Sequence, residues 1–117
     1  MVALAEIERV AKMLGDKAQA ERVILFGSYA RGDVGKHSDV DLLIIAESDL
    51  PRFKRSRELY MLRPHPFAMD LLVYTPQEVE QGRRSPLSFI STVLREGKTI
   101  YVRPDRTGQA VAGQGPQ

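Results

Sequence analysis

The chain has 117 residues, a formal net charge of +2, no cysteine and two histidines, with 43% hydrophobic and 27% charged residues. This length and balance predict one ordinary globular domain, while the net charge is too small to indicate nucleic-acid binding by itself, although a pI near 9.1 leaves an anionic partner open. The lack of cysteine excludes disulfides and thiolate metal sites, and we give His37 and His65 no catalytic role.

The first half of the chain reads as a helix and two strands. Apolar residues at helical spacing predict an amphipathic helix over residues 2–19. A short β-branched run predicts a strand over 22–26 that ends at Gly27. One or two helical turns follow, with Ser28 as a capping candidate, and then a polar loop leads into a second strand over 39–46.

The second half of the chain is also predicted to contain helices and strands in turn. Ser48 to Pro51 predicts the start of a helix that reaches about residue 62. This helix is basic, with Arg52, Lys54, Arg55, Arg57 and Arg63. Such a charge run is typical of a solvated face, and the first four of these residues also allow docking of a polyanion or a protein. We expect a third strand over 67–75, a short helix after Thr75, a helix over 87–95 opened by Ser85-Pro86, and a fourth strand over 99–102.

These elements predict an α/β (α+β) fold with a mixed sheet of about four strands flanked by helices. We expect one domain over residues 1–103 and a flexible tail over 104–117, where the hydrophobic pattern ends. No apolar run reaches the roughly 20 residues that cross a bilayer, and the N-terminus lacks the order of a signal peptide. We therefore expect a cytoplasmic protein without membrane contact.

Three aspartates are the candidate catalytic residues. Asp39 and Asp41 lie two apart on a predicted strand, so both carboxylates point to one side and repel each other unless a cation such as magnesium lies between them. Asp70 is costly in its apolar strand without a partner, and that strand can lie beside the other. Three converging carboxylates can hold two metal ions, with Asp70 also acting as general base. The alternative is that all three are ordinary loop, surface or ion-paired residues.

Four further residues are candidates for nucleotide binding. The turn at Gly27 and Ser28 can offer backbone amides and a hydroxyl to phosphates, or it can be an ordinary strand-to-helix turn. Arg31 is either a donor to a triphosphate or an exposed loop residue. Ser38 either contacts a phosphate or stiffens its loop through a local hydrogen bond.

The combination of Gly27-Ser28, ten intervening residues, Asp39-Val40-Asp41 and a later Asp70 resembles the nucleotidyltransferase superfamily that includes DNA polymerase beta. Over residues 20–102 the chain is most similar to minimal nucleotidyltransferases, the MNT proteins that pair with HEPN-domain partners as antitoxin and toxin. The resemblance implies transfer of a nucleoside monophosphate from a triphosphate to a hydroxyl, with release of pyrophosphate and two magnesium ions. Gly27 and Ser28 would hold the phosphates, and the three aspartates the metals.

The resemblance also implies a partner. Larger members carry a C-terminal helical domain, absent from this chain, that grips the acceptor or covers the base. We therefore expect a separate chain, in a hetero-oligomer, to supply that side of the active site. The expected activity is adenylylation, with ATP, of a tyrosine on a HEPN-type toxin. Two other functions stay open: a non-catalytic antitoxin that binds through residues 52–57, and a small-molecule nucleotidyltransferase of the aminoglycoside-modifying kind.

Overall fold

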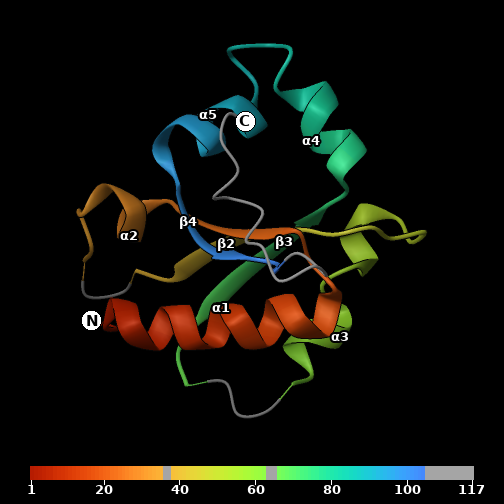
Figure 1. Cartoon of the computed structure of the whole chain (residues 1–117). Helices are drawn as coiled ribbons and strands as arrows, with labels where there is room; N and C mark the ends of the chain where they lie inside the picture. The colour runs from red at the N-terminus through yellow and green to blue at the C-terminus, as the bar shows by residue number, and fades with distance from the viewer. Residues whose placement is uncertain (36–37, 63–65, 105–117) are drawn as a thin grey trace.

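The computed structural model describes residues 1–35, 38–62 and 66–104, and a mixed four-stranded sheet lies at its centre (Figure 1). The strand order is β3-β2-β1-β4. β1 (Arg22–Phe26) runs antiparallel to both β2 (Val40–Ile45) and β4 (Lys98–Val102), whereas β3 (Met69–Tyr74) runs parallel to β2. The predicted mixed sheet is confirmed.

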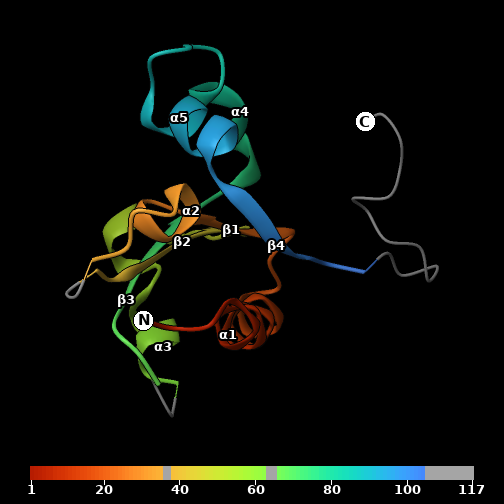
Figure 2. The same cartoon turned by 90° about the vertical axis from the view of Figure 1, so that its left-hand side faces the viewer.

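Helices cover both faces of the sheet. α1 (Leu4–Ala18) and the short α3 (Arg57–Tyr60) lie on one side, and the pair α4 (Pro76–Gly82) and α5 (Phe89–Glu96) lies on the other (Figure 2). Because side chains alternate along a strand, neighbouring residues of β1 enter different cores. Val23 and Leu25 pack in the core beneath α1, while Ile24 packs with Ile90 and Val93 of α5.

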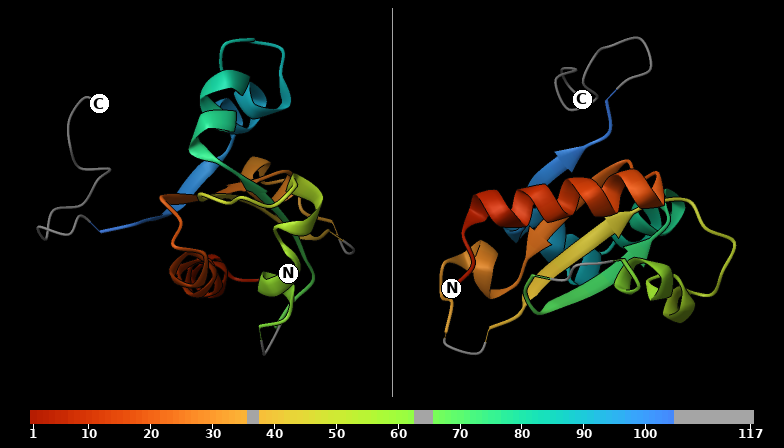
Figure 3. Two further views of the ribbon diagram at one scale, coloured as in Figure 1. Left: turned by 90° about the vertical axis from the view of Figure 1, so that its right-hand side faces the viewer. Right: turned by 90° about the horizontal axis from the view of Figure 1, so that it is seen from below.

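The predicted basic helix is wrong as a single element. The structure has a 3-10 turn, η1 (Arg52–Lys54), followed by the separate helix α3 (Figure 3). The amides of Lys54 and Arg55 donate to carbonyls only three residues back, which gives the tighter winding of a 3-10 turn. The guanidinium of Arg55 is held toward β3 and α4, and we attribute the break in the helix to this anchoring.

One other helix boundary differs from expectation, and a few of the predicted features lie outside the described residues. α5 begins at Phe89 rather than at 87, because the hydroxyl of Ser88 accepts a hydrogen bond from the Ser91 amide and caps the helix there. The tail expected to be flexible lies, from residue 105 on, outside the described residues, as do His37, Arg63 and His65. Within the described ranges no helix is long and apolar enough to span a bilayer.

The outer border of β3 is occupied by side chains. The Leu71 amide donates to the hydroxyl of Tyr60 at 2.7 Å, and the Val73 carbonyl accepts from Arg55 at 3.2 Å. Both partners come from the segment between β2 and β3, so this segment covers part of the edge that an isolated edge strand would leave open.

Candidate active site

Asp41 and Asp70 are brought together by the pairing of β2 with β3. They occupy the same register position of the parallel pair, on strands that lie about 4.8 Å apart. Asp41 lies two residues before Leu43, and Asp70 two residues before Leu72, so each aspartate shares the sheet face of its leucine. Both leucines pack in the core beneath α5. The two carboxylates therefore lie on the face of the sheet that α5 covers. Asp70 is exposed, because it stands near the start of an edge strand, so the expected cost of burying it does not arise.

The surroundings of Asp41 disfavour the ionised form of its carboxyl group. Partial burial raises its pKa above the ordinary value, and the negative charges of Asp70 and Asp39 raise the pKa further, while Arg31 acts in the opposite direction. Asp39, which is exposed and precedes β2, is thus close enough for Asp41 to feel its charge. A cation at this place would relieve the repulsion, and carboxylate oxygens are the ligands that magnesium prefers.

The described residues do not by themselves form a closed metal site. Among them, no group of three or more Asp, Glu, His or Cys side chains has the arrangement that holds an ion. The donor chemistry of the Asp41 and Asp70 pair fits a hard divalent cation, with Asp39 beside it. The two magnesium ions implied by the sequence remain a proposal.

Gly27 places the turn after β1 against Asp41. Its φ of +74° lies in the region that side chains disfavour, and a β-carbon at this position would overlap the carboxylate of Asp41. Only glycine lets the backbone approach so closely. Gly27 is also the N-cap of α2 (Ser28–Arg31), which corrects the expectation that Ser28 caps: Ser28 is the first helical residue.

The start of α2 offers hydrogen-bond donors. The amides of Ala30 and Arg31 donate to the Gly27 carbonyl, whereas those of Ser28 and Tyr29 have no backbone acceptor within the described part of the chain. The Arg31 guanidinium lies 3.3 Å from Asp33 and is half exposed. Ser38 accepts a hydrogen bond from the Gly35 amide at 2.8 Å, which is the loop-stiffening contact that we considered for it.

A pocket of about 430 Å³ joins these residues to α5. One wall comes from the end of β1, from α2 and from β2, with Phe26, Gly27, Ser28, Arg31 and Asp41. The other wall is a single stripe of α5, with Phe89, Thr92, Val93 and Glu96. Asp39, Asp70 and Ser38 are not among the lining residues. The sequence alone does not reveal the α5 wall, because apolar residues at helical spacing mark a buried helix face as readily as a binding site.

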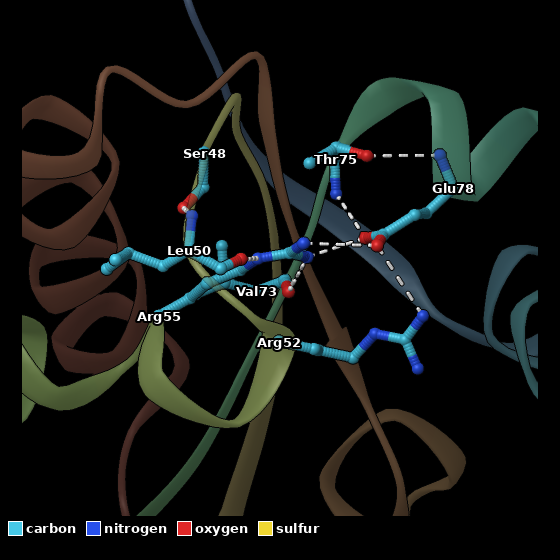
Figure 4. Close-up of polar contacts among 7 residues, drawn as sticks. All are labelled: Ser48, Leu50, Arg52, Arg55, Val73, Thr75 and Glu78. Carbon is cyan, nitrogen blue, oxygen red and sulfur yellow. Dashed lines mark hydrogen bonds and ion pairs between the residues drawn. The ribbon is translucent and has the colours of Figure 1, made fainter.

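The basic segment is used inside the protein. Arg55, whose side chain is 8% exposed, forms a two-pronged ion pair with Glu78 at 2.6 and 3.1 Å, and Arg52 approaches the same carboxylate at 3.6 Å (Figure 4). The hydrogen bond from Arg55 lowers the pKa of Glu78 to about 2. For Arg55 the solvated-face and docking interpretations are therefore both wrong: it fastens the η1 segment to the start of α4.

Glu78 also holds the backbone at Thr75, the residue that follows β3. Its carboxylate accepts from the Thr75 amide at 2.9 Å, while the Thr75 hydroxyl accepts from the Glu78 amide at 3.1 Å. This reciprocal capping box, visible in Figure 4, starts α4 after Thr75, where the sequence analysis expected a short helix.

Known proteins share both the sequence pattern and the fold. Residues 7–66 match the family described as the nucleotidyltransferase domain. A protein of Methanocaldococcus jannaschii named "Putative protein adenylyltransferase" is 29% identical over 73% of this chain and 82% of its own length. Two others of the same name and organism are 46% identical over 43% of this chain and 33% identical over 69%. These two alignments span about half of each relative, 48% and 58%.

Two solved structures have a similar fold. A "putative nucleotidyltransferase" from Sulfolobus solfataricus superposes with a TM-score of 0.56 over 85% of this chain and 83% of that one, at 20% identity. A chain from a structure described as "toxin-antitoxin with AMP-PNP" superposes with a TM-score of 0.55 over 82% and 73%, at 22% identity. The family match spans more than half of the sequence and includes Gly27, Ser28, Asp39 and Asp41. The chain therefore belongs to the nucleotidyltransferase domain family, whose members are enzymes that transfer nucleotidyl groups.

Proposed function

We propose that this nucleotidyltransferase transfers AMP from ATP to a hydroxyl group of a partner protein, a tyrosine of a HEPN-type toxin, and thereby acts as its antitoxin. The observation that carries the proposal is the register of Asp41 and Asp70 on one face of the sheet, beside a turn that only glycine can make. The names of the relatives support the protein substrate, and the similarity to a chain of a toxin-antitoxin structure supports the toxin partner.

Each candidate residue has a role in this proposal. The Ser28 and Tyr29 amides, the Ser28 hydroxyl and Arg31 bind the phosphates, and Arg31 leaves Asp33 to do so. Ser38 contacts a phosphate only if its bond to Gly35 opens. Asp39, Asp41 and Asp70 would hold two magnesium ions, which would neutralise the polyphosphate and favour an ionised acceptor oxygen. Magnesium also fits the site because it would reverse the upward shift in the pKa of Asp41.

The chemical step follows from these positions. The acceptor hydroxyl gives its proton to the carboxylate of Asp70, and its oxygen forms a bond to the α-phosphorus of ATP. The bond between that phosphorus and the oxygen that bridges to the β-phosphorus breaks, and pyrophosphate leaves with the electron pair. Arg31 and the α2 amides stabilise the charge on the leaving group.

The test is co-expression of the chain with the product of its neighbouring reading frame as the candidate partner, followed by intact-mass analysis of that product. We expect a mass gain of one or more AMP groups on a tyrosine with the wild-type chain. With Asp41→Asn the gain should disappear, and with Asp49→Asn, an exposed aspartate outside the pocket, it should remain. A partner that is neutralised without any mass gain would overturn the proposal and favour the binding antitoxin. Transfer to an aminoglycoside but not to the partner would favour the small-molecule enzyme.

A further inference from the structure

Phe89 is a large apolar ring left partly in solvent inside the candidate site. It is the first residue of α5 and lines the same pocket as Gly27, Ser28 and Asp41. Its neighbours Ile90 and Val93 on α5 are buried, at 3% and 2% exposure, whereas Phe89 is 44% exposed. The core of this face of the sheet is thus completed by other α5 residues, and the ring of Phe89 is available to a ligand.

The ring is held in place by its surroundings. It makes an edge-to-face contact with Phe26, with ring centres 5.6 Å apart and planes at 82°, and a tilted contact with Tyr74 at 6.2 Å. The preceding residue, Ser88, caps α5 and donates its hydroxyl hydrogen to the Gly82 carbonyl at 2.6 Å. A ring fixed in this way loses little conformational freedom when a ligand binds to it.

The pocket divides by chemistry into two ends. The wall at Gly27, Ser28 and Arg31 offers amides, a hydroxyl and a positive charge, which suit phosphates. The α5 wall offers an aromatic ring, a valine and a threonine, and its charged member, Glu96, would repel phosphates. The α5 wall therefore fits the uncharged part of a nucleotide.

We propose that Phe89 is the surface on which the base of the donor nucleotide stacks. This inference rests on the proposed function, because it takes the ligand of the pocket to be a nucleoside triphosphate. Stacking on an aromatic side chain uses the face that every base has and needs no hydrogen bond to the base edge. Phe89 thus selects by ring area, and purine nucleotides bind more tightly than pyrimidine nucleotides.

The test compares a ligand with a base and a ligand without one. Binding of ATP, CTP and inorganic tripolyphosphate, each with magnesium, is measured by calorimetry on wild type, Phe89→Leu and Phe89→Trp. Leucine keeps an apolar side chain against Phe26 but lacks a π-face. We expect Phe89→Leu to weaken ATP about tenfold, to reduce the preference for ATP over CTP, and to leave tripolyphosphate unchanged. Phe89→Trp should keep tight binding of ATP.

The matched control is Phe53→Leu, because Phe53 is 81% exposed on η1 and does not line the pocket. It should leave all three ligands unaffected. Unchanged ATP binding in Phe89→Leu would overturn the inference, and so would an equal loss for ATP and tripolyphosphate, which would mean that Phe89 only shapes the pocket. Failure of the proposed function looks different: the wild type would bind ATP through Phe89 and yet transfer no AMP to the partner.

Discussion

Asp41 and Asp70 stand directly opposite each other on the parallel strands β2 and β3, with their side chains on the same face of the sheet. Like charges in this relationship destabilise a sheet, by about 0.2–1 kcal/mol for a directly opposed pair. The fold bears this cost at a place where a glycine turn also approaches one of the two carboxylates. Such a local conflict is common at functional sites.

The first prediction concerns Asp41→Asn. Transfer of AMP from labelled ATP should fall to background, because the amide neither carries the negative charge nor binds magnesium comparably. The variant should also be more stable by about 0.2–1 kcal/mol at neutral pH, since one of two opposed charges is gone. Transfer assays and urea unfolding measure the two effects. Full transfer by the variant would contradict the metal-binding role, and Asp49→Asn serves as the control.

The second prediction concerns the titration of Asp41. Its folded pKa is raised, so the carboxyl group favours folding below its unfolded pKa, and this contribution is lost as the pH rises through the folded value. Burial is the main cause and the charge of Asp70 the second. Asp70→Asn should therefore lower the pKa of Asp41 toward its usual value without restoring it fully. Carbon-detected NMR of the side-chain carboxyl measures this shift.

Titration in the presence of magnesium is a second test of the charge at Asp41. Added to the wild type, it should also lower the apparent pKa of Asp41, because the cation favours the ionised carboxylate. Potassium at equal ionic strength should have a much smaller effect. An apparent pKa that magnesium leaves unchanged would place the ion away from Asp41.

The third prediction compares two glycines. Both Gly27 and Gly32 have positive φ, at 74° and 82°, so alanine strains the backbone at either position, by about 1–2 kcal/mol at Gly32. The strain is larger at Gly27, whose ψ of −153° belongs to a region that glycine alone ordinarily adopts. Gly32 has open space around its would-be β-carbon, whereas at Gly27 that carbon meets Asp41. Gly27→Ala should therefore be the more destabilising change, as measured by thermal unfolding, and should abolish transfer, while Gly32→Ala should keep it.

A double variant isolates the cause of that difference. Removing the carboxylate should remove the overlap, so Gly27→Ala should destabilise an Asp41→Ala background less than it destabilises the wild type. Equal losses in both backgrounds would show that the contact with Asp41 is not what requires glycine at position 27.

The fourth prediction concerns Glu78. Its pKa is lowered from 4.5 to about 2, chiefly by the hydrogen bond from Arg55, so its stabilising contribution is present above pH 4.5 and is lost as the pH falls toward 2. Glu78→Gln should lower the free energy of unfolding at pH 7 by about 1–3 kcal/mol, because the guanidinium of Arg55 keeps its buried position and loses its counter-charge.

The same variant should flatten the acid limb of the stability curve between pH 4.5 and 2. Urea unfolding at several pH values measures both effects. Glu80→Gln is the matched control: Glu80 pairs with Arg83 at 2.8 Å, but both side chains are more than half exposed, and such pairs contribute little. A similar loss in both variants would contradict the anchoring role of Arg55 and Glu78.

Short-range patterns were sufficient to predict the sheet and to select the candidate aspartates. The two-residue spacing of Asp39 and Asp41 and the β-branched runs are patterns that can be recognised within a few residues of sequence. The α5 wall was missed because Phe26 and Phe89 meet only through the packing of α5 on the sheet. The break between η1 and α3 was missed for a similar reason, because it depends on an ion pair between Arg55 and Glu78 that periodicity does not reveal.

The side chains on the outer border of β3 have a consequence for crowded solutions. A second copy that tried to add a strand there would first have to detach Tyr60 from the Leu71 amide and Arg55 from the Val73 carbonyl. Each detachment forfeits a hydrogen bond worth about 1 kcal/mol, and Arg55 would also leave Glu78. Ordered stacking of copies along this border, the first step toward fibrils, is therefore disfavoured during overexpression or storage.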